Sequence, residues 1–382
     1  MVDFAWTEEQ ERFRDTIVRF AQRELNDRIL ERDADAEFSR EAWQKCADFG
    51  LLGLPIPEDY GGSAADPQTI ELALESLGYG CEDNGLLFSL NAHMWSCEIP
   101  ILRFGSDEQK RRYLPGLCDG SLIGVQGMTE PESGSDAFSL RTSATAKGDE
   151  FILNGSKTFI TNAPVADLFV VFASTDPVQR FGGISAFVVE RGTPGLGVGE
   201  PFTKMGLRTS PMSQLYFDDC RVPADHLLGR PGAGMAIFNN SMEWERSFIL
   251  ATAVGAMQRQ LETCIDYARQ RQQFGQPIGK FQSVSNKIVD MKLRLETARL
   301  LMQHLAWARA VGQPTALESA MAKLWVSENF LASSLDSVQI HGGTGYMTGS
   351  GLERQVRDAV ASRIYSGTSE VQRSIIARNL GL

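Results

Sequence analysis

The chain has 382 residues, of which 43% are hydrophobic and 22% charged, and its 48 acidic against 37 basic side chains give a formal net charge of −11. This acidity argues against nucleic-acid partners and anionic membrane surfaces, because both are bound through clustered Lys and Arg. The length favours two or three globular domains that need no disulfide or metal to fold.

The six cysteines and four histidines form no recognisable motif. No two cysteines make a CxxC pair, so we expect reduced, mostly buried thiols in a cytoplasmic protein. The histidines form no HxxH or HExxH pattern, which predicts no metal site. The N-terminus lacks the basic and then apolar regions of a signal peptide, and no apolar run approaches the roughly 18 residues of a membrane span.

Residues 1–120 carry repeated helix signals. Thr7–Gln10 and Ser106–Gln109 are capping boxes, in which the first side chain and the fourth each satisfy a backbone amide at a helix start. Ser39 is a candidate cap for a helix that ends at Gly50, and Asp66-Pro67 places a cap before a proline at the first helical position. This stretch is expected to be an N-terminal helical domain.

Residues 121–230 change to a β pattern. Residues 150–153 and 156–160 are two β-rich runs around Asn154-Gly155, which predicts a hairpin with its turn at that dipeptide. Further strands are expected at Leu168–Ala173, Ile184–Val189 and Gln214–Phe217. Together these runs predict a small antiparallel β domain.

Residues 231–382 are again helical, and the helices are long. Val284–Val311 contains no proline or glycine, and a second run extends from Pro314 to His341 and stops at Gly342-Gly343. Two long neighbouring helices are typical of a four-helix-bundle-like domain. The whole pattern predicts an α+β fold with domains at 1–120, 121–230 and 231–382, rather than a doubly wound sheet.

Two segments in the middle stretch are candidates for ligand binding. Met128–Asp136 is rich in hydroxyl residues and glycine, and its backbone amides could bind an anionic group. Phe159–Asn162 ends a strand with an aromatic ring and a hydroxyl group. Read alone, the first segment is more often a turn-rich loop and the second a strand end. The chain has no GxGxxG, Walker A or GxSxG motif.

Several segments, taken in order over the full length, resemble the acyl-CoA dehydrogenase family. These are FAD flavoproteins that introduce a double bond beside a thioester. The matching segments are Phe4–Gln10, Leu54–Gly62, Met128–Asp136, Phe159–Asn162, Arg271–Gly275, Gln339–Gly343 and Ser366–Glu370. Many relatives have Trp where this chain has Phe159.

The resemblance implies an FAD site built from separate segments. Thr129 and Thr161 would hydrogen-bond the isoalloxazine ring, and Met128 and Phe159 would pack beside it. Arg271 would face the pyrophosphate, which suits the two parallel donors of a guanidinium group. The other cofactor-binding residues implied in this way are Gly134, Ser135, Phe274, Gln282, Gln339, Gly342, Gly343, Thr368 and Glu370.

Part of that site is expected to come from a neighbouring subunit. Arg271 and Phe274 match the segment that reaches a neighbour's FAD in the family, and Gln282, Gln339 and Gly343 would complete it. A glycine at 343 allows close backbone approach, which a side chain would block. We therefore expect a homotetramer or a homodimer. The implied substrate-binding residues are Ser135, Glu243, Arg246, Ser366 and Gly367.

The chemistry requires a carboxylate base near the substrate α-carbon. Most family members place a glutamate just before the Gly-Thr of the last motif, but this chain has Ser366 there. A minority, resembling isovaleryl- and long-chain acyl-CoA dehydrogenases, supply the glutamate from another helix, and the matching residue here is Glu245. Glu243 is a competitor on another side of that helix, and a structural ion pair is the alternative role for Glu245.

The surroundings of Glu245 also fit a base. An apolar or small face of one helix follows Glu245 at helical spacing. Its members are Phe248, Ile249, Thr252, Gly255 and Ala256. Such a face would desolvate the carboxylate and raise its pKa toward the range useful for a base.

The expected reaction is α,β-dehydrogenation of a short or branched acyl thioester of CoA or acyl carrier protein. Met94, Trp95 and Trp244 could narrow the pocket, although such residues are more often core. An alternative is a prolyl or aminoacyl group on a carrier protein, for which Lys110–Arg112 is the one dense basic candidate. The electron acceptor would be an electron-transfer flavoprotein or O₂. A flavin-binding protein without catalysis is the alternative from another class.

Overall fold

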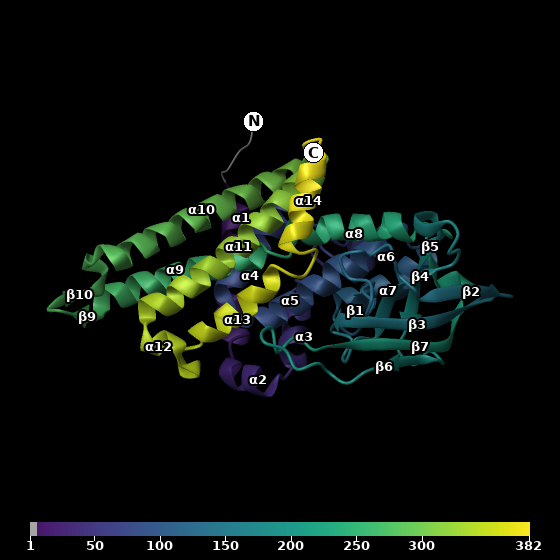
Figure 1. Cartoon of the computed structure of the whole chain (residues 1–382), viewed down its shortest axis with the longest axis horizontal. Coiled ribbons are helices and arrows are strands. Elements are labelled where there is room, and N and C mark those ends of the chain that lie inside the picture. The colour runs from purple at the N-terminus through teal and green to yellow at the C-terminus, as the bar shows by residue number, and fades with distance from the viewer. Residues whose placement is uncertain (1–5) are drawn as a thin grey trace.

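The computed structural model describes residues 6–382, so Phe4 and Ala5 of the first motif, and the first five residues of the segment that argued against a signal peptide, lie outside it. Helices come first along the chain, then a β-sheet, then long helices (Figure 1). This order confirms the α+β fold, with an N-terminal helical, a middle β and a C-terminal helical part. No helix in residues 6–382 is long and apolar enough to cross a membrane.

The N-terminal helices begin where the sequence places their caps. Thr7 and Ser106 each form a complete capping box, with Gln10 and Gln109 respectively. The Asp66 carboxylate accepts from two backbone amides at the start of α4. The helices are α1 (Glu8–Glu24), α2 (Ile29–Asp35), α3 (Arg40–Asp48), α4 (Pro67–Gly80), α5 (Asn84–His93), α6 (Ile99–Phe104) and α7 (Asp107–Cys118). A π-helical turn, Met94–Glu98, joins α5 to α6.

The middle strands form one mixed sheet, so the expectation of an antiparallel domain is wrong in this respect. The strands are β1 (Gly124–Gly127), β2 (Ser143–Lys147), β3 (Glu150–Thr161), β4 (Leu168–Ser174), β5 (Ile184–Glu190), β6 (Leu196–Val198), β7 (Met212–Pro223) and β8 (Leu227–Leu228). Their order is β6-β7-β3-β2-β4-β5-β8, with β1 paired to β4. Most pairs are antiparallel, but β4 runs parallel to both β1 and β2. The long connection between β1 and β2 makes these parallel pairs possible.

Asn154-Gly155 is not a hairpin turn, which corrects the sequence-based prediction. Strand β3 runs straight through this dipeptide, and the turn lies earlier, where Lys147 pairs with Glu150. Against β7 the register shifts between Leu153 and Gly155, so the glycine marks a β-bulge. Gly155 has φ +145°, and a Cβ there would lie 2.6 Å from the Thr142 hydroxyl. The backbone conformations open to glycine, which suit a tight turn, here allow a β-bulge.

The C-terminal part contains the two long helices that the sequence predicts. They are α10 (Gln282–Ala310) and α11 (Ala316–His341), and Gly342 ends α11 with φ +57°. The other elements are α8 (Gly234–Phe248), α9 (Ala251–Gln270), β9 (Gln272–Gln273), β10 (Gln276–Pro277), α12 (Gly343–Tyr346), α13 (Leu352–Ser362) and α14 (Ser369–Asn379).

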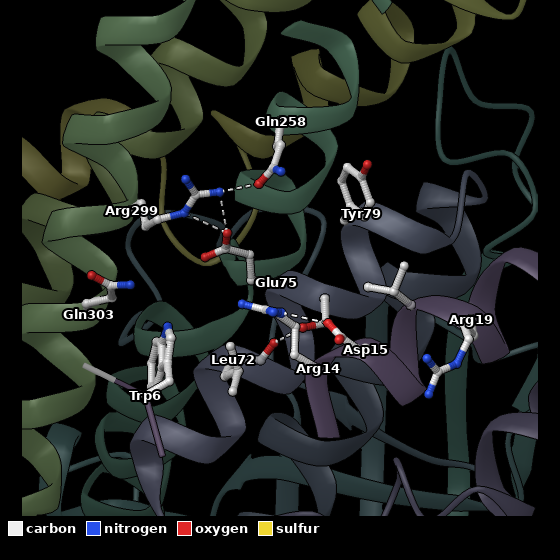
Figure 2. A pocket seen from close by; sticks show the side chains of 12 residues that line it. Trp6, Arg14, Asp15, Arg19, Leu72, Glu75, Tyr79, Gln258, Arg299 and Gln303 are labelled. Atoms are coloured by element: carbon white, nitrogen blue, oxygen red, sulfur yellow. Dashed lines mark hydrogen bonds and ion pairs between the residues drawn. The ribbon is translucent and has the colours of Figure 1, made fainter. Parts of the chain in front are cut away.

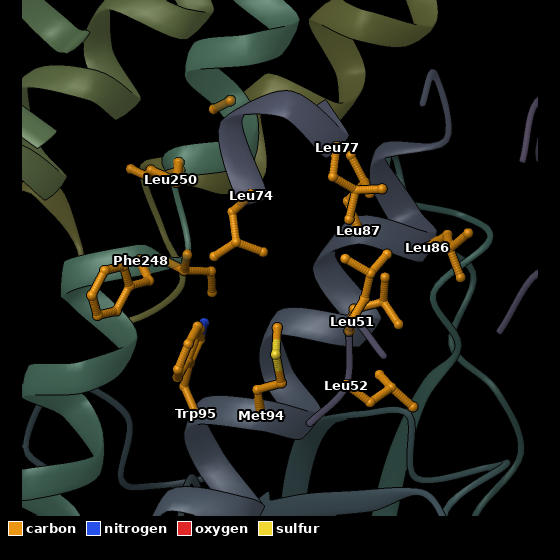
Figure 3. Packing of buried hydrophobic residues seen from close by; sticks show 14 of the residues in the cluster. Leu51, Leu52, Leu74, Leu77, Leu86, Leu87, Met94, Trp95, Phe248 and Leu250 are labelled. Carbon is orange, nitrogen blue, oxygen red and sulfur yellow. The ribbon is translucent and has the colours of Figure 1, made fainter. Parts of the chain in front are cut away.

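Helix α9 crosses α4 of the N-terminal part at two glycines. A Cβ on Gly78 would lie 1.9 Å from the Thr252 carbonyl oxygen, and a Cβ on Gly255 would lie 2.0 Å from the Glu75 carbonyl oxygen. The backbones can approach this closely only because neither glycine has a side chain. Figure 3 shows the core beside this crossing, where Leu74 of α4 packs near Trp95 and Phe248.

The helix that carries Glu245 ends sooner than the sequence suggests. Helix α8 stops at Phe248 and α9 starts at Ala251, with Ile249 and Leu250 in the break. The continuous apolar face from Phe248 to Ala256 is therefore a wrong prediction, because Thr252, Gly255 and Ala256 belong to a different helix. Apolar residues fill both helices and the break, so hydrophobic periodicity alone could not locate it.

Candidate functional site

Glu245 lies in the last turn of α8 and is buried, with 8% of its surface exposed. The Ser366 hydroxyl donates a hydrogen bond to Oε1 of Glu245. Burial raises the pKa of Glu245 above its ordinary value, while the Ser366 hydrogen bond and the nearby charges of Arg246 and Lys323 oppose that rise. Glu245 makes no salt bridge within the described part of the chain. It is thus a desolvated carboxylate held by a neutral donor, and not one member of a structural ion pair.

Ser366 and Gly367 form a strained turn opposite Glu245. Their φ values are +56° and +89°, and the left-handed region costs a non-glycine residue about 1–2 kcal/mol. Four hydrogen bonds hold the turn carbonyls: Arg246 Nε and Gln372 Nε2 donate to Ser366 O, each at 3.1 Å, and Lys323 Nζ and Gln372 Nε2 donate to Gly367 O, each at 2.8 Å. The turn is therefore fixed from three helices, α8, α11 and α14.

The other residues of the last motif lie at the start of α14. Thr368 caps this helix, and its hydroxyl accepts from the Val371 amide at 3.3 Å. Glu370 lies in the first turn and is exposed. The structure thus places Thr368 and Glu370 next to the Ser366–Gly367 turn, at a helix N-terminus that favours anionic groups.

Glu243 is bound on a different side of α8 from Glu245. Its Oε1 accepts from the Thr315 hydroxyl at 2.7 Å and pairs with Arg309 at 3.4 Å. The Arg309 guanidinium lies 4.1 Å from the centre of the Trp244 ring. This pairing holds α8 against the start of α11. A role of Glu243 in substrate binding stays a prediction.

The segments around Met128 and Phe159 are brought together at the sheet. The Thr158 amide donates to Thr129 O at 2.9 Å, which joins the two segments. Met128 is buried, whereas Phe159 is 63% exposed and has a left-handed φ of +57°. Thr161 ends β3 and is half-buried. Gly134 and Ser135 are both exposed.

A buried ion pair supports this pair of segments, and sequence reasoning missed it. Lys157 Nζ lies 2.7 Å from Glu130 Oε1 and also donates to Met128 O at 3.2 Å. Burial lowers the pKa of Lys157 to about 8. Burial also works to raise the pKa of Glu130, but Lys157, the Thr142 hydrogen bond and the Arg141 amide bring it below its usual value. Glu130 stands in the segment Met128–Asp136 and Lys157 stands two residues before Phe159, so a charged side chain within a strand was the available signal.

The remaining cofactor candidates lie at the opposite end of the chain's fold. Arg271 and the β9–β10 hairpin follow α9, and Phe274 at the hairpin tip is 93% exposed with φ +51°. Tyr267, one helical turn before Arg271, stacks on His341 at a ring distance of 4.2 Å, which places Gln339, Gly342 and Gly343 beside this hairpin. Gln282 opens α10 directly after it. Figure 1 shows β9, β10 and α12 at one end of the molecule and the sheet at the other.

The chain therefore divides its predicted site into three groups. One lies at the sheet (Met128 to Thr161), one at Glu245 and the Ser366–Gly367 turn, and one at the β9–β10 hairpin. The residues fit a flavin chemically, because Phe159 offers an exposed ring and Thr129 and Thr161 are hydroxyl residues. Arg271 and the open backbone at Gly342 and Gly343, where a Cβ would meet nothing within 4 Å, suit an anionic, extended group.

One cavity lies elsewhere and contains none of the predicted site residues. It measures roughly 530 Å³ and is bounded by α1, α4, α9 and α10. Figure 2 shows Arg299 bonded to Glu75 and Gln258 at its wall. In residues 6–382 no group of three His, Cys, Asp or Glu side chains is arranged to hold a metal ion.

Two further sequence-based expectations concern the residues of the substrate pocket and the basic run that could bind a carrier protein. Met94 and Trp95, considered as pocket residues, are instead fully buried in the core shown in Figure 3. In the basic run, Lys110 lies 4.0 Å from Asp107, and Arg112 pairs with Glu190 at 2.6 Å. Two of the three charges of this run are therefore already matched within the chain.

Comparison with known proteins covers nearly the whole chain. Models of the acyl-CoA dehydrogenase N-terminal, middle and C-terminal domains match residues 7–121, 126–220 and 232–381. The L-prolyl peptidyl-carrier protein dehydrogenase of Pseudomonas fluorescens is 45% identical over 90% of this chain and 91% of its own length. The mitochondrial short-chain specific acyl-CoA dehydrogenase of Rattus norvegicus is 40% identical over 98% of this chain and 90% of its own.

Two solved structures also match over nearly the whole chain. The prolyl acyl carrier protein oxidase AnaB has a TM-score of 0.98 and 51% identity, covering 99% of this chain and 100% of its own. The structure of PigA with FAD and proline has a TM-score of 0.97 and 43% identity, covering 100% of this chain and 99% of its own.

We expect Lys157→Met to destabilise the fold and to weaken cofactor retention. The substitution leaves the Glu130 carboxylate buried without its cation, a change that costs about 3–5 kcal/mol when a buried pair is broken. Thermal unfolding and the FAD content of the purified protein measure the effect. Lys147→Met, at an exposed end of β2, is the matched control, and equal melting temperatures for the two variants would contradict the assignment.

Proposed function

Because the chain belongs to the acyl-CoA dehydrogenase family, whose members are FAD-dependent oxidoreductases that act on CH–CH groups, we propose that Glu245 is the base that removes the α-proton of an acyl thioester. FAD, when bound, supplies the acceptor for the hydride that leaves the β-carbon. The observation that carries this proposal is the buried Glu245 carboxylate, which accepts from Ser366, the residue that stands at the family's usual base position.

The local chemistry supports this role for Glu245. A base that takes a weakly acidic α-proton gains from an elevated pKa, because a stronger base accepts the proton more readily. Burial raises the pKa of Glu245 while Ser366, Arg246 and Lys323 keep the ionised form accessible. The Ser366 hydroxyl also fixes the direction of one carboxylate oxygen, which leaves the other to face the substrate. Thr129, Thr161, Phe159 and Arg271 are proposed to bind FAD as the resemblance implies.

For the substrate we propose a small cyclic or branched acyl group, of the prolyl type, on a carrier-protein thioester. Two of the relatives named above act, by their names, on prolyl groups of carrier proteins. A short-chain acyl-CoA is the second candidate, supported by the similarity to the rat enzyme.

A panel of thioesters tests the substrate proposal. The holoprotein is mixed anaerobically with prolyl-carrier protein, prolyl-CoA, butyryl-CoA and palmitoyl-CoA, and loss of the oxidised flavin absorbance is followed. We expect the prolyl-carrier protein to reduce the flavin fastest and palmitoyl-CoA to be inactive. Faster reduction by butyryl-CoA would favour the second candidate, and a flavin that no thioester reduces would contradict a dehydrogenase. O₂ uptake, compared with reduction of an electron-transfer flavoprotein, then identifies the electron acceptor.

We expect Glu245→Gln to bind FAD normally and to lose substrate-driven flavin reduction. Removing a positioned general base lowers a rate by about 10²–10⁴-fold. Glu108→Gln is the control, since Glu108 is exposed in the first turn of α7 and undergoes the same loss of charge, and it should stay within a few-fold of the wild type. In the wild type the rate should rise with pH because the base must be ionised. The midpoint of this rise should lie above the ordinary glutamate pKa. Fast reduction by Glu245→Gln would place the base elsewhere.

We also propose that the chain forms a homotetramer or homodimer that works in the cytoplasm. Apolar side chains stand exposed on the long helices, including Val289, Leu293 and Leu300 on α10 and Trp325 on α11, in a pattern that marks protein interfaces. The distance between the hairpin group and the sheet group supports a site shared between subunits. The buried free thiols of all six cysteines support a reducing compartment. Domain limits at 1–120, 121–230 and 231–382 remain part of this proposal.

Leu293→Glu should dissociate the oligomer, because it would bury a carboxylate in an apolar contact. Light scattering after size-exclusion chromatography measures the mass of the species. Val178→Glu is the control: Val178 is 89% exposed on the loop after β4, away from the long helices, and the substitution should leave the mass unchanged. A wild-type chain that elutes as a monomer would overturn the proposal.

A further inference from the structure

Lys323 is a fully buried lysine of α11 that the sequence analysis did not single out. Its side chain has 0% exposure, and within residues 6–382 it forms no salt bridge. Its one hydrogen bond goes to Gly367 O at 2.8 Å. Burying an ammonium group costs free energy unless hydrogen bonds or opposite charges offset it, so a lysine at this position needs an explanation.

The explanation lies in the groups that surround it. Lys323 Nζ lies over the Tyr365 ring at 5.8 Å, and its charge interacts with those of Arg246 and Glu245, and more weakly with those of Glu328 and Glu370. Burial lowers the pKa of Lys323 to about 8, with Arg246 lowering it further and the carboxylates opposing. The carboxylates thus oppose the loss of charge that burial favours.

Three charged or titratable groups act on Glu245, and they come from α8, from α11 and from the residue before the Ser366–Gly367 turn. They are Arg246 of α8, Lys323 of α11 and Tyr365 just before the turn. Arg246 and Lys323 are both cations, and each also donates to a carbonyl of the turn, Arg246 to Ser366 O and Lys323 to Gly367 O. The same turn presents the Ser366 hydroxyl to Glu245 Oε1. One lysine can therefore act on the carboxylate both through its charge and through the turn.

We propose that Lys323 is a positioning residue for the base, which holds the Ser366–Gly367 turn against Glu245 and supplies part of the positive charge that keeps this carboxylate ionised. This inference rests on the proposed role of Glu245. A residue that served only the fold would keep α11 packed on α14 without altering the ionisation of Glu245. The two roles are separated by the pH dependence of the reaction.

Lys323→Met tests the inference, because methionine keeps much of the apolar length and loses both the charge and the donor. The rate of anaerobic flavin reduction by a saturating thioester is measured in the holoenzyme from pH 6 to pH 9.5. We expect the part of the profile in which the rate rises with pH to move to higher pH by on the order of one unit. At a pH within that part, the rate would then be about tenfold lower than in the wild type. Lys323→Arg keeps the charge and should keep this part of the profile near the wild-type position.

Two further variants complete the experiment. Lys323→Gln keeps a donor for Gly367 O without the charge, so it should show the same shift, and it replaces the methionine variant if that protein does not fold. Lys292→Met, at an exposed position of α10, should leave the profile unchanged. A rise that coincides with the wild type in Lys323→Met or Lys323→Gln overturns the inference, even if the rate is lower at every pH, because that result describes a structural lysine.

Glu245→Gln in the same assay separates this inference from the proposed function. If Glu245→Gln abolishes flavin reduction while the lysine variants keep the wild-type profile, only the role of Lys323 fails. If Glu245→Gln still reduces the flavin at the wild-type rate, the base lies elsewhere and both proposals fall.

Discussion

The close crossing of α4 and α9 is the contact on which the position of the site depends. Gly78 and Gly255 let the two backbones touch, and any side chain at either place would force the helices apart. Because only two residues separate the end of α8 from the start of α9, this crossing also fixes where α8 stops. Glu245 in the last turn of α8 is thereby held between the N-terminal and C-terminal helices. The carboxylate of Glu245, which stands on a helix, gains its fixed position from this packing.

Two buried lysines solve the same problem at two places in the fold. The segment after β1 and the Ser366–Gly367 turn are both irregular backbone, whose carbonyls need donors that no helix or strand provides. Lys157 supplies one to Met128 O, and Lys323 supplies one to Gly367 O. Negative charge offsets the cost of burying each ammonium group. Glu130 pairs directly with Lys157, whereas several carboxylates act on Lys323 without forming a salt bridge with it.

Local signals in the sequence predict local structure well and long-range arrangement poorly. Capping boxes at Thr7 and Ser106 and the stop at Gly342 depend on neighbours within a few residues, and the structure confirms them. Asn154-Gly155 carries the same local signal for a turn, yet pairing with β7 converts it into a bulge. Lys323 could not be linked to Gly367, because nothing in the sequence brings positions 44 residues apart together. The chain's family, in contrast, follows from the order of its motifs.

The early end of α8 has a consequence for the strength of the base. Peptide dipoles aligned along a helix leave the equivalent of about half a negative charge at its C-terminus. Glu245 lies within that last turn, and its own carbonyl accepts from the Ile249 amide in the break. The helix field therefore resists ionisation of the carboxylate and favours its protonated form, as burial does. A helix that continued through this region would have placed Glu245 mid-helix, away from that field, and left it a weaker base.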